Sequence, residues 1–187
     1  MLLDPSDWRE FNAPLEGVIP HMYQCVAGRV TTGIGCIIDP MSLALELPWQ
    51  RGYQPATRDE VADEWWRVKK MKRGLLAARY QGPLYLTNVA IDALLKERLE
   101  ANEAVLCKSL AHFESFPLQA QKALHSMAWA LGAGFVHKWP RLRQAVLDRD
   151  WLKAAEECSI STVGNEGVRA RNSENRGLFL EAAVGES

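Results

Sequence analysis

Long apolar runs are missing from this chain of 187 residues. A membrane-spanning helix needs roughly 18 to 20 consecutive apolar residues, and no stretch approaches that length. The N-terminal sequence MLLDPSDWRE carries acids where a signal peptide would have a basic region. We therefore expect a protein that is synthesised in the cytoplasm without a signal peptide, does not bind a membrane, and reaches any external target by another route.

Paired cysteines are also missing. The cysteines at positions 25, 36, 107 and 158 include neither a CxxC pair nor the density of a disulfide-stapled fold, so reduced thiols are expected. His21 with Cys25 and Cys36 lacks a fourth ligand at a usual zinc spacing. The sequence therefore predicts no metal site and implies no cofactor.

Charge of one sign is not concentrated enough to indicate a nucleic-acid partner. The net charge is -1, with two basic and six acidic residues in 1–50 and twenty basic against seventeen acidic in 51–187. Nucleic-acid binding needs a basic stripe, usually interleaved with aromatic rings, whereas the seven tryptophans here are scattered. A nucleic-acid partner is not expected.

The residues that are present favour a folded α+β domain. A chain of 187 residues that is 48% hydrophobic can bury a sizeable core. We expect a single domain made of a helix and β-hairpin lobe (1–47), an insertion (48–83) and a larger helical lobe (84–187), with a helix-dominated composition. The default location for a site is a cleft between the lobes.

The first lobe is expected to begin with a helix over residues 5–15. Asp4 is placed as its N-cap, Pro5 suits the first helical position, and Pro14 predicts an early end. Strands over 21–26 and 29–34 follow, joined by a turn near Ala27-Gly28, with a third short strand over 36–38.

Helix signals dominate the rest of the chain. Residues 42–47 predict a helical turn and 48–56 an ordered surface loop. One helix is expected to start at the Thr57 capping box and end by Gly74, and the next to run over 87–113. Three more are expected to start at Pro117, Pro140 and Asp148, and a last one to cover 170–184. Apolar positions at helical spacing predict Ile91, Leu95, Leu99, Leu106, Leu110 and Phe113 as one buried face.

Three chemically active side chains stand on a short segment that contains several glycines. Eight residues separate Glu16 from Cys25, and five separate Cys25 from Thr31. Glycosidic-bond hydrolysis needs an acid for the leaving oxygen and a second group for water or the sugar's developing charge. Glu16, among apolar neighbours, suits the acid, and Cys25 and Thr31 suit the handling of water or nucleophilic attack.

This pattern resembles the phage-type lysozymes, the endolysin muramidases of glycoside hydrolase family 24. That family carries Glu, eight residues, Asp or Cys, five residues, Thr, and then a TxGxG-like continuation, matched here by Thr32-Gly33-Ile34-Gly35. The runs LTNVAIDALLKERL, QKALHSMAWALG, DRDWLKAAEEC and RNSENRGLF occur in the family's order. Nothing in the resemblance covers residues 48–83.

The resemblance implies a lysozyme-like fold and a muramidase that cleaves the β-1,4 bond between N-acetylmuramic acid and N-acetylglucosamine in peptidoglycan. Glu16, Cys25 and Thr31 would be its catalytic residues. Arg171, with Arg169 as a substitute, lies where the family places an arginine that faces the acid. Trp49 and Trp66, aromatic residues of the expected insertion, are candidates for stacking on sugar rings.

Two other readings remain open. A lytic transglycosylase needs no water-handling group, which would leave the spacing of Cys25 and Thr31 unexplained. A non-catalytic module that binds glycan or a protein partner is the second, and it is kept open by Cys in place of Asp. The expected partner is the peptidoglycan strand, acted on by a monomer in the periplasm or on the wall after holin release or delivery by a secretion machine. A secreted effector would also have an immunity protein.

Overall fold

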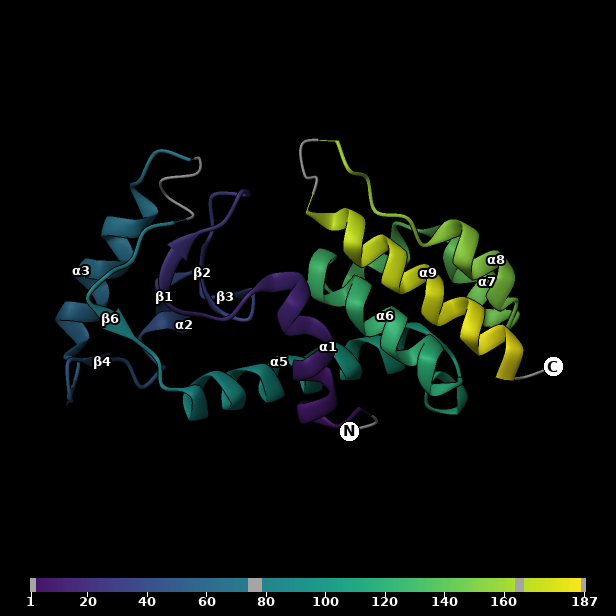
Figure 1. Cartoon of the computed structure of the whole chain (residues 1–187), viewed down its shortest axis with the longest axis horizontal. Helices are drawn as coiled ribbons and strands as arrows, with labels where there is room; N and C mark the ends of the chain where they lie inside the picture. The colour runs from purple at the N-terminus through teal and green to yellow at the C-terminus, as the bar shows by residue number, and fades with distance from the viewer. Residues whose placement is uncertain (1–2, 74–78, 164–166, 186–187) are drawn as a thin grey trace. The chain divides into compact units, whose positions relative to one another are not determined.

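The computed structural model describes residues 3–73, 79–163 and 167–185 and divides the chain into two compact units (Figure 1). The sheet unit is Asn12–Glu97, and the helical unit combines Met1–Phe11 with Arg98–Ser187. The structure is α+β with helix dominant, as predicted. The expected insertion over 48–83 belongs entirely to the sheet unit.

The predicted hairpin is confirmed in the sheet unit. Strands β1 (Ile19–Gln24) and β2 (Val30–Gly33) are antiparallel, and β3 (Cys36–Ile37) pairs with β2 to give the order β1-β2-β3. Tyr23 pairs with Thr31 and Gln24 with Val30, so the connecting turn covers residues 25–29. The β-branched residues of β2 are buried, in keeping with a strand covered on both faces.

Helix α1 (Pro5–Glu16) starts as the sequence predicts and ends later. The Asp4 carboxylate accepts from the Ser6 amide at 2.8 Å and so caps the first turn. The prediction of an early end at Pro14 is wrong. Proline removes one amide donor, yet the helix continues to Glu16, and the Gly17 amide still donates to the Ala13 carbonyl at 2.8 Å.

A second small sheet lies where a surface loop was expected, so that prediction is wrong. Strands β4 (Gln50–Arg51), β5 (Gln54–Pro55) and β6 (Leu84–Tyr85) form it in the order β5-β4-β6. Trp49 directly precedes β4 and is only 2% exposed. Its indole N–H donates at 2.8 Å to the carbonyl of Ala44 in α2 (Met41–Ala44), so burial costs no unpaired donor.

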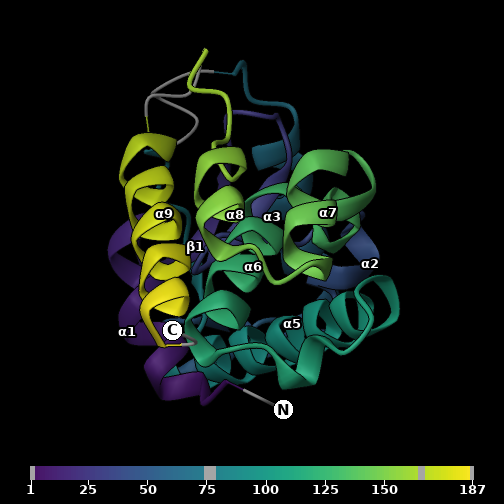
Figure 2. The same cartoon turned by 90° about the vertical axis from the view of Figure 1, so that its right-hand side faces the viewer.

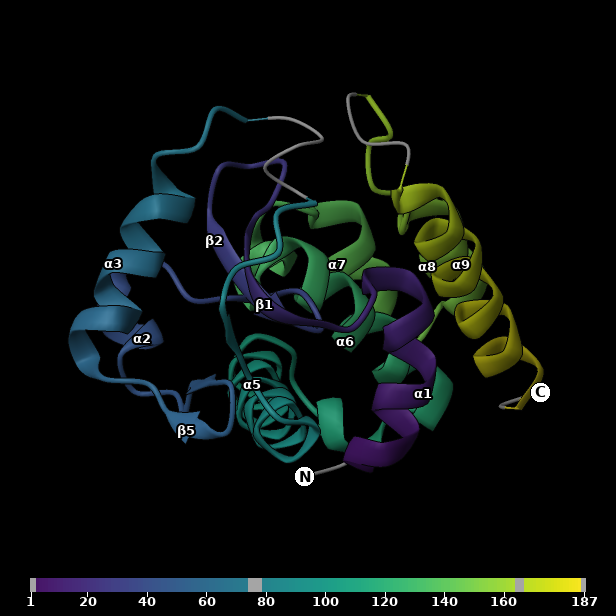
Figure 3. The same cartoon turned by 60° about the vertical axis from the view of Figure 1, so that its left-hand side comes forward.

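Helix α3 (Arg58–Lys69) covers the first sheet (Figure 3). Its predicted capping box is present: Thr57 accepts from the Glu60 amide, and the Glu60 carboxylate accepts from the Thr57 amide. Val61, Trp65 and Val68 are buried, and the Trp65 indole donates to the Ile38 carbonyl at 2.8 Å. The helix thus packs its apolar face against the sheet that carries the hairpin.

The helical unit is built on α9 (Val168–Gly185), which lies along α6 (Leu118–Leu131) and α8 (Trp151–Glu157), as Figure 2 shows. Its other elements are α5 (Asn88–Ser109), which starts in the sheet unit, η1 (Phe113–Ser115), η2 (Ala133–His137) and α7 (Pro140–Leu147). All six residues predicted as a buried face from Ile91 to Phe113 are buried. The predicted start at Asp148 is wrong: that residue ends α7, and Asp150 caps α8 by accepting from the Lys153 amide at 2.9 Å.

A buried histidine makes the helical unit sensitive to acid. His125 of α6 is fully buried between the rings of Trp8 and Phe113, at centroid distances of 5.9 and 5.8 Å. Neither ring nitrogen has a hydrogen-bond partner among the described residues. Burial lowers the pKa of His125 to about 4, although the Glu103 carboxylate 4.0 Å away acts in the opposite direction.

We expect this histidine to weaken the fold as the pH falls. The unfolded chain binds the proton near pH 6.5 and the folded chain only near pH 4, so about 3 kcal/mol of unfolding free energy should be lost between these values. The unfolding free energy, measured with denaturant across this pH range, should change less with pH in His125→Gln than in the wild type. The matched exposed variant, His137→Gln, should keep the wild-type slope. Parallel curves for wild type and His125→Gln would contradict the assignment.

Candidate functional site

The carboxylate of Glu16 lies against the turn between β2 and β3. Glu16 is the last residue of α1 and is partly buried. A Cβ built on Gly35 would come within 2.5 Å of Glu16 Oε2, and Gly35 has a φ of +67°. Only glycine allows both this backbone conformation and this approach. The helix end and the glycine turn therefore hold the predicted acid at one defined place.

The structure brings Cys25 and Thr31 together at the other end of the hairpin. The Cys25 amide and the Thr31 hydroxyl both donate to the Arg29 carbonyl oxygen, at 3.0 and 3.1 Å. Because Tyr23 pairs with Thr31, the alternation of side chains puts Cys25 and Thr31 diagonally on one face. Cys25 is partly exposed, whereas Thr31 is 2% exposed.

Helix α3 fixes the turn that carries the thiol. The buried side-chain amide of Gln24 donates to the carbonyls of Val68 and Lys69, at 3.3 and 3.1 Å, at the C-terminal end of α3. The Lys69 ammonium donates to the Gly28 carbonyl at 3.2 Å and also to the Asp39 carboxylate. We call these contacts of Gln24 and Lys69 the α3 clamp. Part of the expected insertion is therefore a support for the hairpin.

The three predicted binding residues have different surroundings. Trp49 belongs to the core, so its ring has no free face for a sugar, and the prediction of a stacking role for Trp49 is wrong. Trp66 is 48% exposed, with the Lys70 ammonium 5.5 Å from its ring, and keeps a usable surface. Arg171 of α9 is buried and donates to the carbonyl and hydroxyl oxygens of Ser126, at 3.2 and 2.9 Å.

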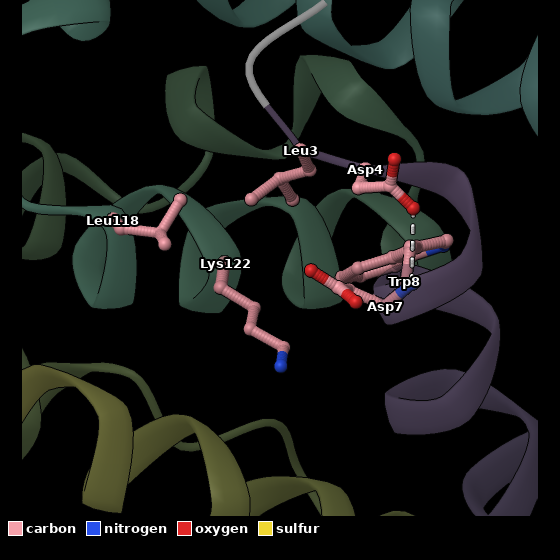
Figure 4. A pocket seen from close by; sticks show the side chains of 6 residues that line it. All are labelled: Leu3, Asp4, Asp7, Trp8, Leu118 and Lys122. Carbon is pink, nitrogen blue, oxygen red and sulfur yellow. Dashed lines mark hydrogen bonds between the residues drawn. The ribbon is translucent and has the colours of Figure 1, made fainter.

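One hollow among the described residues lies away from the predicted site. A hollow of about 210 Å³ in the helical unit is lined by Leu3, Asp4, Asp7, Trp8, Leu118 and Lys122 (Figure 4). It contains none of the predicted site residues and is smaller than the usual ligand pocket of roughly 300 Å³ or more. Among the described residues there is no group of three potential metal ligands, and none of the helices there is both long and apolar enough to cross a bilayer.

No family model and no curated protein matches the sequence. We therefore infer the function from the residues of the hairpin and from the local geometry of the sheet unit. Within that unit, Glu16, Cys25 and Thr31 all lie on or beside the three strands of the first sheet.

Several supporting residues could not be identified from spacing. Gly35 was part of the recognised motif, but its contact with Glu16 follows from the path of the chain after β2. Gln24 sits at the end of a strand with no motif around it, and its partners are more than forty residues away. Lys69 belongs to a run of basic residues that begins at Arg67, which was the one available signal.

Proposed function

We propose that the chain is a muramidase that cleaves the β-1,4 bond between N-acetylmuramic acid and N-acetylglucosamine. The observation that carries the proposal is the placement of Glu16 at the end of α1 against Gly35, in the unit whose hairpin holds Cys25 and Thr31 on one face. The resemblance of this segment to glycoside hydrolase family 24 supplies the substrate class. A lysozyme-like fold is part of the same proposal.

Glu16 would supply the proton to the leaving glycosidic oxygen. General acid catalysis needs a carboxylic acid held at one place beside the leaving oxygen. The end of α1 and the close approach to Gly35 hold the Glu16 side chain in this way.

Cys25 and Thr31 would handle the incoming water or the sugar's anomeric carbon. The Thr31 proton is directed at the Arg29 carbonyl, so its oxygen is left to accept a hydrogen bond from water. A water that donates this hydrogen bond directs one proton at Thr31, so its lone pairs point away from Thr31. The Cys25 sulfur lies on the same face, where its thiolate form can accept the second proton of that water or attack the sugar directly.

Mass analysis of digested peptidoglycan tests the proposal. We expect products with reducing ends, because hydrolysis adds water across the bond. Each is heavier by one water than the corresponding anhydro product. Anhydro ends would show a lytic transglycosylase instead. Binding without release of fragments would show a non-catalytic module. The two biological settings, endolysin and secreted effector, share the first result and differ in whether an immunity protein is found with the chain.

Glycine 35 provides a test of the acid's position. Alanine at a left-handed backbone position costs about 1 kcal/mol, and its methyl group would also displace the Glu16 carboxylate. We expect Gly35→Ala to lose about 10²-fold in wall hydrolysis, because an ångström-scale misplacement of a catalytic group has that effect.

Gly52→Ala is the matched control. Gly52 has a similar φ of +61° and nothing within 4 Å of a built Cβ, so it carries the backbone cost without the contact. It should lose the same stability and keep its activity. Equal activity of the two variants would remove Glu16 from the chemistry.

A further inference from the structure

A strongly basic stretch near the hairpin has no role in the chemistry proposed above. Residues 67–79 contain six basic and no acidic side chains: Arg67, Lys69, Lys70, Lys72, Arg73 and Arg79. The first five lie at or just beyond the C-terminal end of α3. The net charge of the whole chain is -1, so this is a local excess.

Part of this charge is already balanced. Arg67 pairs with the buried Glu64 carboxylate at 3.2 Å, and Lys69 pairs with Asp39. Lys70 lies over the exposed ring of Trp66. By contrast, Lys72 and Arg73 have no carboxylate partner among the described residues.

Arg73 lies directly on the turn that carries Cys25. A Cβ built on Gly28 would collide with Arg73 Nε, so the guanidinium group covers the backbone of the turn. Gly28 donates its amide to the Cys25 carbonyl at 2.8 Å, and the neighbouring Arg29 side chain is exposed. Two arginines that are 44 positions apart in sequence are therefore both placed at this turn, Arg73 over its backbone and Arg29 as one of its exposed residues.

We propose that Arg29 and Arg73 form a binding site for the carboxylates of the peptide stems that peptidoglycan carries on its muramic acid residues. The inference rests on the proposed function and specifies which part of the substrate this side of the site contacts. A planar guanidinium group matches a carboxylate through two parallel hydrogen bonds. Trp66 beside Lys70 adds an exposed ring of the kind that packs on sugars.

The confined position of the charge favours this ligand over a phosphate polymer. The excess is limited to one turn and one helix end, whereas nucleic acids and anionic bilayers are bound by extended basic faces. Peptide stems, in contrast, carry separate carboxylates rather than a continuous chain of phosphates, and they branch from the glycan close to the bond that is cleaved. The site therefore fits an isolated carboxylate next to the reacting sugar.

Sedimentation with purified sacculi tests the inference in a Glu16→Gln background, which removes turnover from the measurement. The double variant Arg29→Gln/Arg73→Gln should bind intact sacculi about tenfold more weakly, the combined effect of two exposed ion pairs. Sacculi whose stem carboxylates have been converted to amides with a carbodiimide and ammonia keep their cross-links and lack the charge, so they should bind both proteins equally. The control Arg58→Gln/Arg141→Gln removes two exposed charges away from the turn. It should bind sacculi as well as its parent, the Glu16→Gln variant with all arginines intact.

Each result separates this inference from the proposed function. Equal binding of the double variant and its parent to intact sacculi would overturn the stem site even if the wild type hydrolyses walls. Stem-dependent binding lost in the double variant would support it even if hydrolysis is not found. Equal loss of binding to treated and intact sacculi would overturn it, and so would a charge-dependent affinity for RNA or phosphatidylglycerol vesicles that exceeds the affinity for sacculi.

Discussion

Glu16→Gln should lower wall hydrolysis by at least about 10²-fold, because glutamine cannot give a proton to the leaving oxygen. The amide has nearly the same shape as the carboxyl group, so its contact with Gly35 and the end of α1 should be kept. The melting temperature is therefore expected to stay close to that of the wild type. Turbidity loss of purified cell walls and a thermal scan measure the two properties on the same samples.

Glu10→Gln is the matched control for this variant, because Glu10 is an exposed acid on the same helix. It should keep full activity. If Glu16→Gln also kept near-normal activity, both the hydrolytic and the transglycosylase proposals would fail, since each needs this acid.

The second large effect is expected at Cys25. If its sulfur handles water or attacks the sugar, Cys25→Asp should retain much of the activity, because a carboxylate can serve in either role. Cys25→Ala should lose most of it. The partly exposed position of the thiol also predicts that alkylation inactivates the protein and that added glycan slows the inactivation.

A purely structural role for Cys25 predicts the reverse order. Alanine would then be nearly harmless, and aspartate would be damaging because a charge would be placed in the turn without a partner. Cys36→Ala provides the reference for a structural cysteine, because Cys36 is buried in β3. This variant should be less stable, but its activity per folded molecule should equal that of the wild type. Full activity in Cys25→Ala would remove this residue from the site.

The parts of the fold that were predicted correctly are specified by residues close together in sequence. The α1 cap at Asp4, the capping box at Thr57, the turn around Gly28 and the helix that follows Pro117 all depend on hydrogen bonds or backbone limits within a few positions. These signals depend little on segments far away in the sequence. They also place Cys25 and Thr31 on one hairpin from the sequence alone.

The second sheet could not be predicted for the opposite reason. Its strands have two residues each, which is too short for an alternating pattern, and β4 pairs with β6 more than thirty positions later. The role of Trp49 was mispredicted for the same reason, since only the fold shows that α2 supplies its hydrogen-bond acceptor. The partners of Arg171 and the clamp on the turn likewise depend on distant segments.

The α3 clamp has a consequence for the order in which the site can form. A hairpin can pair its strands as soon as both have been synthesised, but here the Gln24 amide must find carbonyls 44 and 45 positions further along the chain. Closing a loop of that length costs entropy before it gains a contact. The place of the thiol therefore depends on a segment more than forty residues away, and a shortened chain that omits α3 would keep the motif and lose the contacts that hold the turn.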